Sequence, residues 1–207
     1  MQIIKQAKAI ATTFAFFAVM TVANAASADG VETRVRGTVT SLTGTDLLVK
    51  SREGSSVPIT LKPDWKVVGI GKASVSDIKV GDFVGIASLP TVDGGDGALE
   101  VLIFPAALKG TGEGSYAWDL QPKSSMTNAT VSKAVKAVDG STVTLTYQGK
   151  DKTITVTDNT PVVTFADATN ADVKSGATVF VPGQKSPNGT ISSGLVIVGT
   201  NGVVPPM

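Results

Sequence analysis

The sequence predicts an all-β protein with two small barrels in tandem, each of five to six strands. Two observations support this fold class. Runs of β-branched and small polar residues alternate along most of the chain, as half-buried strands require. The same order of runs then returns at an offset of 95 or 96 residues. We therefore expect two copies of one β module within the 207 residues.

The first copy begins at Val31, where the composition changes to the alternating pattern. Val35, Gly37 and Val39, for example, alternate with polar residues. Strands are expected near residues 35–40, 47–49, 57–61, 83–87 and 99–104, with a short helical turn at 73–79. Each copy therefore supplies three strands, a helical turn and two more strands.

The second copy repeats this order after an irregular stretch. Three pairs of segments carry the match: residues 135–140 with 39–44, 153–156 with 58–61, and 171–176 with 76–81. Each copy is about 70 residues long, a size at which small domains can fold.

The element order suits a closed five-stranded barrel of the oligonucleotide/oligosaccharide-binding (OB) type, which removes the sheet edges. A two-sheet β-sandwich is the alternative, because short strands at this spacing suit it equally well. The predicted domains are a first barrel over 31–104, a connector rich in glycine and aromatic residues over 105–128, and a second barrel over 129–207.

Residues 1–25 have the pattern of a signal peptide. Lys5 and Lys8 precede an uncharged apolar run over residues 9–22, which is shorter than the ~20 residues of a membrane span. Small-x-small cleavage patterns end at residue 25 and again at residue 28. We expect a periplasmic or secreted product with no membrane span after cleavage.

Charge and residue types exclude several classes of function. Loss of Lys5 and Lys8 leaves 16 of the 18 basic residues against 17 acidic ones, so nothing indicates a nucleic-acid partner. The chain has no His and no Cys, which excludes Ser-His-Asp and Cys-His catalysis and nearly all zinc and copper sites. It also has no P-loop motif. We expect no catalytic residues, no metal site and no cofactor.

The connector holds the candidate site. Tyr116, Trp118 and Asp119 lie close together in the sequence and outside any predicted core strand. Such aromatic residues can stack on sugars or anchor a protein partner, but they can also seal the seam between two barrels. The glycines at 110–114 lack a βαβ context, which favours an ordered loop over a phosphate cradle.

Acidic residues suggest two weaker alternatives. Glu113 and Asp119 would suit a hydrolase that uses a carboxylate pair, although two solvated charges are the simpler interpretation. Asp93 and Asp96 supply oxygen ligands for Ca²⁺, but their spacing misses the EF-hand pattern and favours a turn. A metal-handling protein with carboxylate ligands is the second hypothesis and a hydrolase the third.

The repeated turns, the stretch FPAALKGTGEG followed by WDL and SSMTNATV, and the end VVPP resemble an exported bacterial family of unknown function, numbered five-six-six-six. The resemblance covers residues 35–207 and implies tandem small β-barrels but no activity. Some relatives have names that suggest metal transport. Some have a His directly after the Gly-Glu-Gly sequence. This chain has Ser115 there, which weakens a metal function.

The sequence favours an exported, non-enzymatic binding or scaffolding module of the cell envelope. The expected contact residues are Glu113, Tyr116, Trp118 and Asp119, and the expected partner is an envelope protein or a glycan.

Overall fold

The computed structural model describes residues 30–92, 94–137 and 140–205. These residues form twelve strands and three short 3-10 turns, with no α-helix in the described ranges. The strands are β1 (Val31–Thr43), β2 (Asp46–Ser51), β3 (Ser56–Ala73), β4 (Phe83–Pro90), β5 (Asp96–Ile103), β6 (Gly114–Ala117), β7 (Ser125–Ala137), β8 (Gly140–Tyr147), β9 (Lys150–Thr157), β10 (Val162–Ala166), β11 (Thr178–Lys185) and β12 (Ile191–Gly199). The 3-10 turns are η1 (Val75–Asp77), η2 (Ala106–Leu108) and η3 (Asn170–Asp172). The all-β prediction is confirmed.

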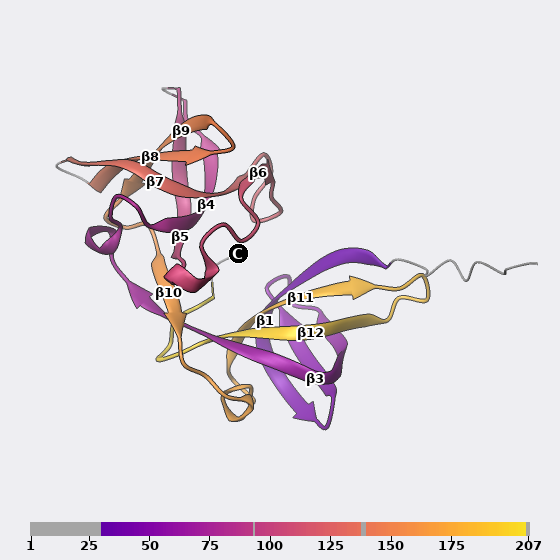
Figure 1. Ribbon diagram of the computed structural model, residues 1–207. Coiled ribbons are helices and arrows are strands. Elements are labelled where there is room, and N and C mark those ends of the chain that lie inside the picture. The colour runs from indigo at the N-terminus through magenta and orange to yellow at the C-terminus, as the bar shows by residue number, and fades with distance from the viewer. Residues whose placement is uncertain (1–29, 93, 138–139, 206–207) are drawn as a thin grey trace, which may run out of the picture.

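Strands β1, β2, β3, β12 and β11 close into one ring, which we call the β1 barrel (Figure 1). β1, β2 and β3 form an antiparallel meander, and β11 pairs with the other edge of β1. β12 completes the ring between β11 and β3, and it runs parallel to β3. This arrangement is a closed five-stranded barrel of the predicted OB type rather than a sandwich.

Strands β7, β8, β9, β5 and β4 follow the same order, and we call this unit the β7 barrel. β7, β8 and β9 form its meander, and β4 pairs with the other edge of β7. β5 lies between β4 and β9 and runs parallel to β9 over two residue pairs. Each parallel contact joins strands that are distant along the chain.

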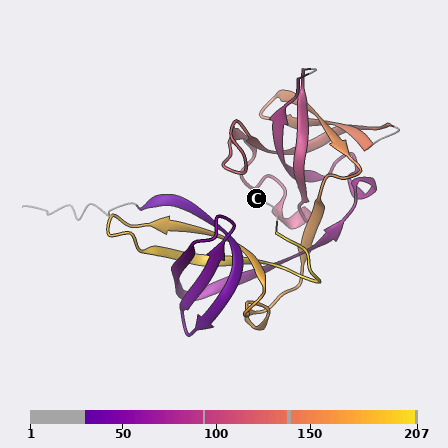
Figure 2. The same ribbon diagram turned by 180° about the vertical axis from the view of Figure 1, so that it is seen from behind.

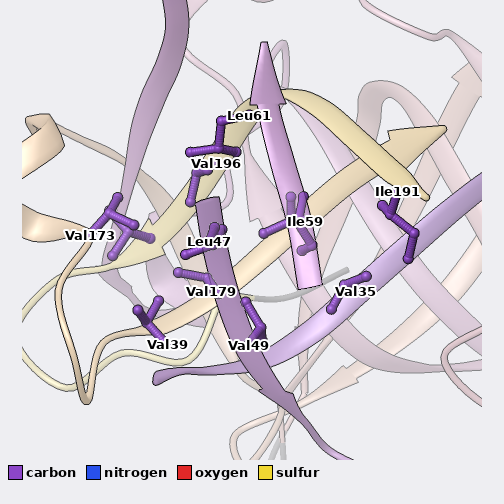
Figure 3. Close-up of a cluster of buried hydrophobic side chains, with 12 residues drawn as sticks. Val35, Val39, Leu47, Val49, Ile59, Leu61, Val173, Val179, Ile191 and Val196 are labelled. Atoms are coloured by element: carbon purple, nitrogen blue, oxygen red, sulfur yellow. The ribbon is translucent and has the colours of Figure 1, made fainter. Parts of the chain in front are cut away.

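Alternating inward side chains fill each barrel with its own apolar core. Figure 3 shows the core of the β1 barrel, in which Leu47, Val49, Ile59 and Leu61 point toward Val196 and other side chains from β11 and β12. A separate cluster fills the β7 barrel, with Val84, Ile86, Val101, Val131, Val143, Leu145, Ile154 and Val156 among its members. A third cluster, with Ile70, Leu102, Val163, Phe180 and Ile197, combines residues from strands of both barrels.

The parallel ladders that close the two barrels coincide under a shift of 95 residues. Ile191 pairs with Ile59 in the β1 barrel, and Asp96 pairs with Ile154 in the β7 barrel. Residues 59 and 154 differ by 95, and so do 96 and 191. The parallel pair Val196–Val67 and the pair Val101–Val162 correspond in the same way.

The chain crosses between the barrels in β3 and returns in β10. These strands pair antiparallel, and Ile70 lies opposite Phe165. Positions 70 and 165 differ by 95, so each residue of this pair is the repeat equivalent of its own partner. The flanking pairs Gly71–Thr164 and Gly69–Ala166 exchange with each other. The crossing therefore has the pattern of a two-fold, self-complementary contact.

The strand pairing differs from the predicted division into 31–104, 105–128 and 129–207. The β1 barrel takes its strands from residues 31–73 and 178–199, whereas the β7 barrel is formed by residues 83–157. The 105–128 segment lies within the β7 barrel, between β5 and β7, rather than between the two barrels. Alternation marks the strands but not their partners, so sequence order alone misassigned the closing strands.

Figures 1 and 2 show the two barrels as separate lobes, with indigo and yellow strands together in the β1 barrel. Within the described ranges, the fold contains no helix with the length and apolar character needed to cross a membrane. The predicted signal peptide lies outside the described residues.

Candidate functional site

The candidate site is built on the hairpin of β6 and β7. β6 pairs antiparallel with β7, from Gly114 opposite Asn128 to Ala117 opposite Ser125. The backbone N–H of Trp118 donates to the carbonyl of Ser124 over 2.8 Å. The buried Ser124 hydroxyl lies 2.7 Å from the carbonyl oxygen of Gln121 and so fixes the loop. This loop presents Trp118 and Asp119.

Trp118 contacts the neighbouring β1 barrel through two arginines of β1. The guanidinium carbon of Arg34 lies 4.2 Å from the centroid of the Trp118 ring, and that of Arg36 lies at 5.8 Å. Arg36 also lies 5.0 Å from the Phe180 ring of β11. The tryptophan ring therefore receives cation–π contacts from the other barrel.

Asp119 binds the same two arginines. Its Oδ1 accepts a hydrogen bond of 2.7 Å from Arg36, and its Oδ2 lies 3.7 Å from Arg34. Partial burial acts to raise the pKa of Asp119, but the hydrogen bond and charge of Arg36, helped by Arg34, outweigh it and lower the pKa. Asp119 is therefore ionised at neutral pH and fixes the hairpin to the β1 barrel. We call Arg34, Arg36, Tyr116, Trp118 and Asp119 the seam cluster.

Two buried donors of the seam cluster lack a hydrogen-bond partner among the described residues, namely Arg36 Nε and Trp118 Nε1. A buried donor without a partner costs about 1–3 kcal/mol. Such groups are rare in folded proteins, and each calls for a specific explanation. A ligand that carries an acceptor would satisfy either of them.

A cavity of about 80 Å³ adjoins the cluster on the outer surface of the β7 barrel. Its apolar lining includes Leu102, Phe104 and Met126, and its polar lining includes Glu100. Glu100 is 8% exposed, which is unusual for a carboxylate. Tyr116 and Trp118 line the same cavity, with their rings 6.1 Å apart in an edge-to-face arrangement.

Tyr116 is the exposed part of this arrangement, with 41% of its surface accessible. Burial of its remaining surface raises the pKa of its hydroxyl, with Arg34 opposing and Glu32 assisting the rise. The hydroxyl accepts a hydrogen bond of 3.1 Å from Asn128 Nδ2. It therefore keeps its own proton available to a ligand at neutral pH.

The structure brings together three of the four residues that the sequence singled out. Tyr116, Trp118 and Asp119 belong to the seam cluster, but Glu113 has a different partner. Its Oε1 accepts a hydrogen bond of 2.9 Å from the backbone N–H of Gln148, in the turn between β8 and β9. Glu113 and Asp119 therefore hold different parts of the fold.

Sequence reasoning missed Arg34, Arg36, Glu100 and the cavity. One signal was available: Arg34 and Arg36, two of the three arginines of the chain, lie two positions apart in the alternating stretch that begins at Val31, so they share a face. Glu100 was hidden because an acidic residue in an otherwise apolar strand does not reveal its neighbours.

Larger hollows occur elsewhere on the described surface. A hollow of about 1060 Å³ lies near η1 and the turn before β10, where Lys72, Lys136 and Asp158 contribute to its wall. Its lining residues include no aromatic ring and neither of the two unpartnered donors. We therefore favour the smaller cavity beside the seam cluster despite its size.

The acidic loop that suggested calcium gives no support to a metal site. Asp93 lies outside the described residues, and the Asp96 carboxylate lies 3.6 Å from Lys152 Nζ. Across the described ranges, no group of three or more Asp, Glu, His or Cys residues is arranged to hold a metal ion.

Comparisons with known proteins provide no further assignment. No protein-family model, curated protein or solved structure matches the chain.

Proposed function

We propose that this chain is an exported, non-enzymatic binding module of the cell envelope that holds its ligand at the seam cluster and the adjoining cavity. The observation that carries the proposal is the pair of buried donors, Arg36 Nε and Trp118 Nε1, that have no partner within the described residues. They lie where residues of both barrels meet, beside a partly exposed aromatic ring. A ligand acceptor in the cavity, which Trp118 lines, would remove the penalty at Trp118 Nε1.

Export rests on the sequence pattern of residues 1–25. The expected partner is therefore an envelope protein or a glycan. Tyr116 suits either one, because tyrosine offers an apolar ring face together with a hydroxyl that can form hydrogen bonds.

A binding role fits the seam cluster better than acid–base catalysis does. A general acid needs a pKa near the working pH, whereas Arg36 and Arg34 lower the pKa of Asp119. Glu113 binds the backbone of Gln148 instead of facing Asp119. These separate partners favour a binding role over a hydrolase that uses the two carboxylates as a pair.

A fluorescence titration tests the proposal. The chain has two tryptophans, so Trp65→Phe leaves Trp118 as the only indole reporter. This variant should be titrated with a panel of soluble envelope glycans and peptides. We expect at least one saturable change in Trp118 emission, with a dissociation constant below about 1 mM (about −4 kcal/mol).

Arg34→Ala in the same background should weaken that binding, because Arg34 lies over the indole ring. Lys62→Ala removes an exposed basic residue of β3, which does not pair with β1, and should leave binding unchanged. A panel with no saturable change would contradict the proposed function.

A further inference from the structure

The cavity beside the seam cluster has a composition that selects for a particular ligand group. Its apolar lining comes from Leu102, Phe104 and Met126, and its polar groups include the buried Glu100 carboxylate and Trp118. The Trp118 indole N–H is buried and unpartnered within the described part of the chain. The site therefore offers an apolar surface together with polar groups that donate and accept hydrogen bonds, those of Tyr116 and Asn128 included, within a small volume.

Charge argues against an ionic ligand group. An anion would approach the Asp119 carboxylate, whereas a cation would approach the Arg34 and Arg36 guanidiniums around Trp118. Charges that lose water without a matched partner are strongly disfavoured. A neutral group that both accepts and donates a hydrogen bond avoids either conflict.

A secondary amide with a methyl group meets these requirements. Its carbonyl would accept from Trp118 Nε1, and its N–H would donate to Glu100. A carboxylate offers about four lone-pair sites, so Glu100 can accept this bond beside its other interactions. The methyl group would contact the apolar lining.

The volume of the cavity limits the size of the ligand group. A cavity of about 150 Å³ accommodates benzene, so about 80 Å³ suits a group of roughly four heavy atoms. An acetamido group has that size. The exposed Tyr116 ring stands at the cavity wall, where it can stack on the apolar face of a sugar ring attached to that group.

We propose that the cavity receives the acetamido group of an N-acetylated amino sugar, with the sugar ring against Tyr116. This inference rests on the proposed function and names its ligand class. The amide makes no covalent bond, and recognition depends on one accepted and one donated hydrogen bond together with methyl burial.

Calorimetric titration with three β-1,4-linked disaccharides tests the inference on the full purified protein. The probes are the disaccharides of N-acetylglucosamine, of glucosamine and of glucose. We expect the acetylated disaccharide to bind at least about tenfold more tightly than either of the others, because only it supplies the amide.

Variants assign the effect to the cavity. Trp118→Phe removes the indole donor and keeps an aromatic ring, and Glu100→Gln replaces one carboxyl oxygen with an NH₂ donor. Each should weaken binding of the acetylated disaccharide about tenfold or more. Trp65→Phe is the matched control and should bind like the wild type, because Trp65 packs against the core of the β1 barrel.

Saturation-transfer NMR on the wild-type protein provides a measurement that does not depend on variant folding. The acetyl methyl protons should receive the strongest saturation, because the methyl is the most deeply buried part of the ligand. Weaker saturation of the methyl than of the ring protons would overturn the inference.

The outcomes separate the inference from the proposed function. Equal affinity for all three disaccharides, with sensitivity to Trp118→Phe, would overturn the acetamido assignment and retain the seam as a binding site. Equal binding of N-acetylalanine amide would overturn the sugar assignment in favour of a peptide. Absence of disaccharide binding would overturn the inference. The proposed function fails only if none of the envelope glycans and peptides in the fluorescence titration binds either.

Discussion

The two barrels are closed by strands in equivalent positions, but the side chains at these closing strands are apolar in one barrel and charged in the other. In the β1 barrel, Val57 and Ile191 belong to or pack against the apolar core. The positions 95 residues away in the β7 barrel are Lys152 and Asp96, whose charged groups lie 3.6 Å apart. Lys152 Nζ also donates to the Ser125 hydroxyl over 2.9 Å.

The strand that follows differs as well. β3 continues through Ser56–Ala73, whereas its counterpart in the β7 barrel divides into β9 and β10 around a turn. In that turn the Thr160 hydroxyl accepts a hydrogen bond from the backbone N–H of Thr157. Because partly buried ion pairs lose hydration, apolar closure stabilises a barrel more reliably than polar closure. The comparison indicates that the β7 barrel, which carries the cavity, is the less tightly closed unit.

The largest expected effect comes from cutting the chain between β5 and β7. A protease site inserted beside the exposed Gly110 would leave three strands of one barrel and two of the other on each fragment. We expect the fragments to stay associated after cleavage and to be unfolded when produced separately. Size-exclusion chromatography with circular dichroism measures both properties.

The uncut variant is the control for the insertion itself. Two fragments that separate as folded monomers would contradict the observed strand pairing.

A matched pair of core truncations compares the barrels directly. Ile59 and Ile154 occupy positions 95 residues apart and are both fully buried. Ile59→Ala and Ile154→Ala should each reduce the free energy of unfolding by about 2–5 kcal/mol. Because β3 and β10 join the barrels, both variants should lower one shared transition in urea. Two transitions, each sensitive to only one variant, would show that the barrels unfold independently.

The charged pair Asp96–Lys152 of the β7 barrel can be replaced by the apolar residues that occupy the equivalent positions of the β1 barrel. Asp96→Ile alone removes the carboxylate near the largely buried Lys152 and should cost about 1–3 kcal/mol of stability. Asp96→Ile with Lys152→Val should recover most of that loss, because well-packed apolar residues can replace an ion pair. A double-mutant cycle in urea measures the coupling. Additive losses would contradict the equivalence of the two closures.

The smallest expected effect concerns Asp119, which joins the barrels. Its folded-state pKa is lowered, so its stabilisation is present above the unfolded-state value of about 3.9 and is lost as pH falls through the lower folded value. The carboxylate is about half exposed, so we expect less than about 1 kcal/mol.

Asp119→Asn should therefore be less stable than the wild type at pH 6, with the difference shrinking toward pH 2. Urea unfolding at several pH values measures this trend. A difference that grows as pH falls would have the wrong sign for the assigned pKa shift.

Alternation in the sequence was sufficient to predict small all-β barrels, because inward residues such as Leu47 and Val143 must recur every second position. It could not identify the partners of β4, β5, β11 and β12, since either barrel offers them a compatible edge. Tyr116, Trp118 and Asp119 were conspicuous outside the predicted strands. Arg36 and Glu100 acquire their roles only through contacts between distant strands.

The indole N–H resonances provide the most direct measurement of the central claim. A ¹⁵N-labelled sample has two such signals, from Trp65 and Trp118. Titration with the N-acetylglucosamine disaccharide should shift the Trp118 signal progressively and leave the Trp65 signal in place. An unchanged Trp118 signal at a saturating concentration would contradict a ligand site at the seam that uses this buried donor.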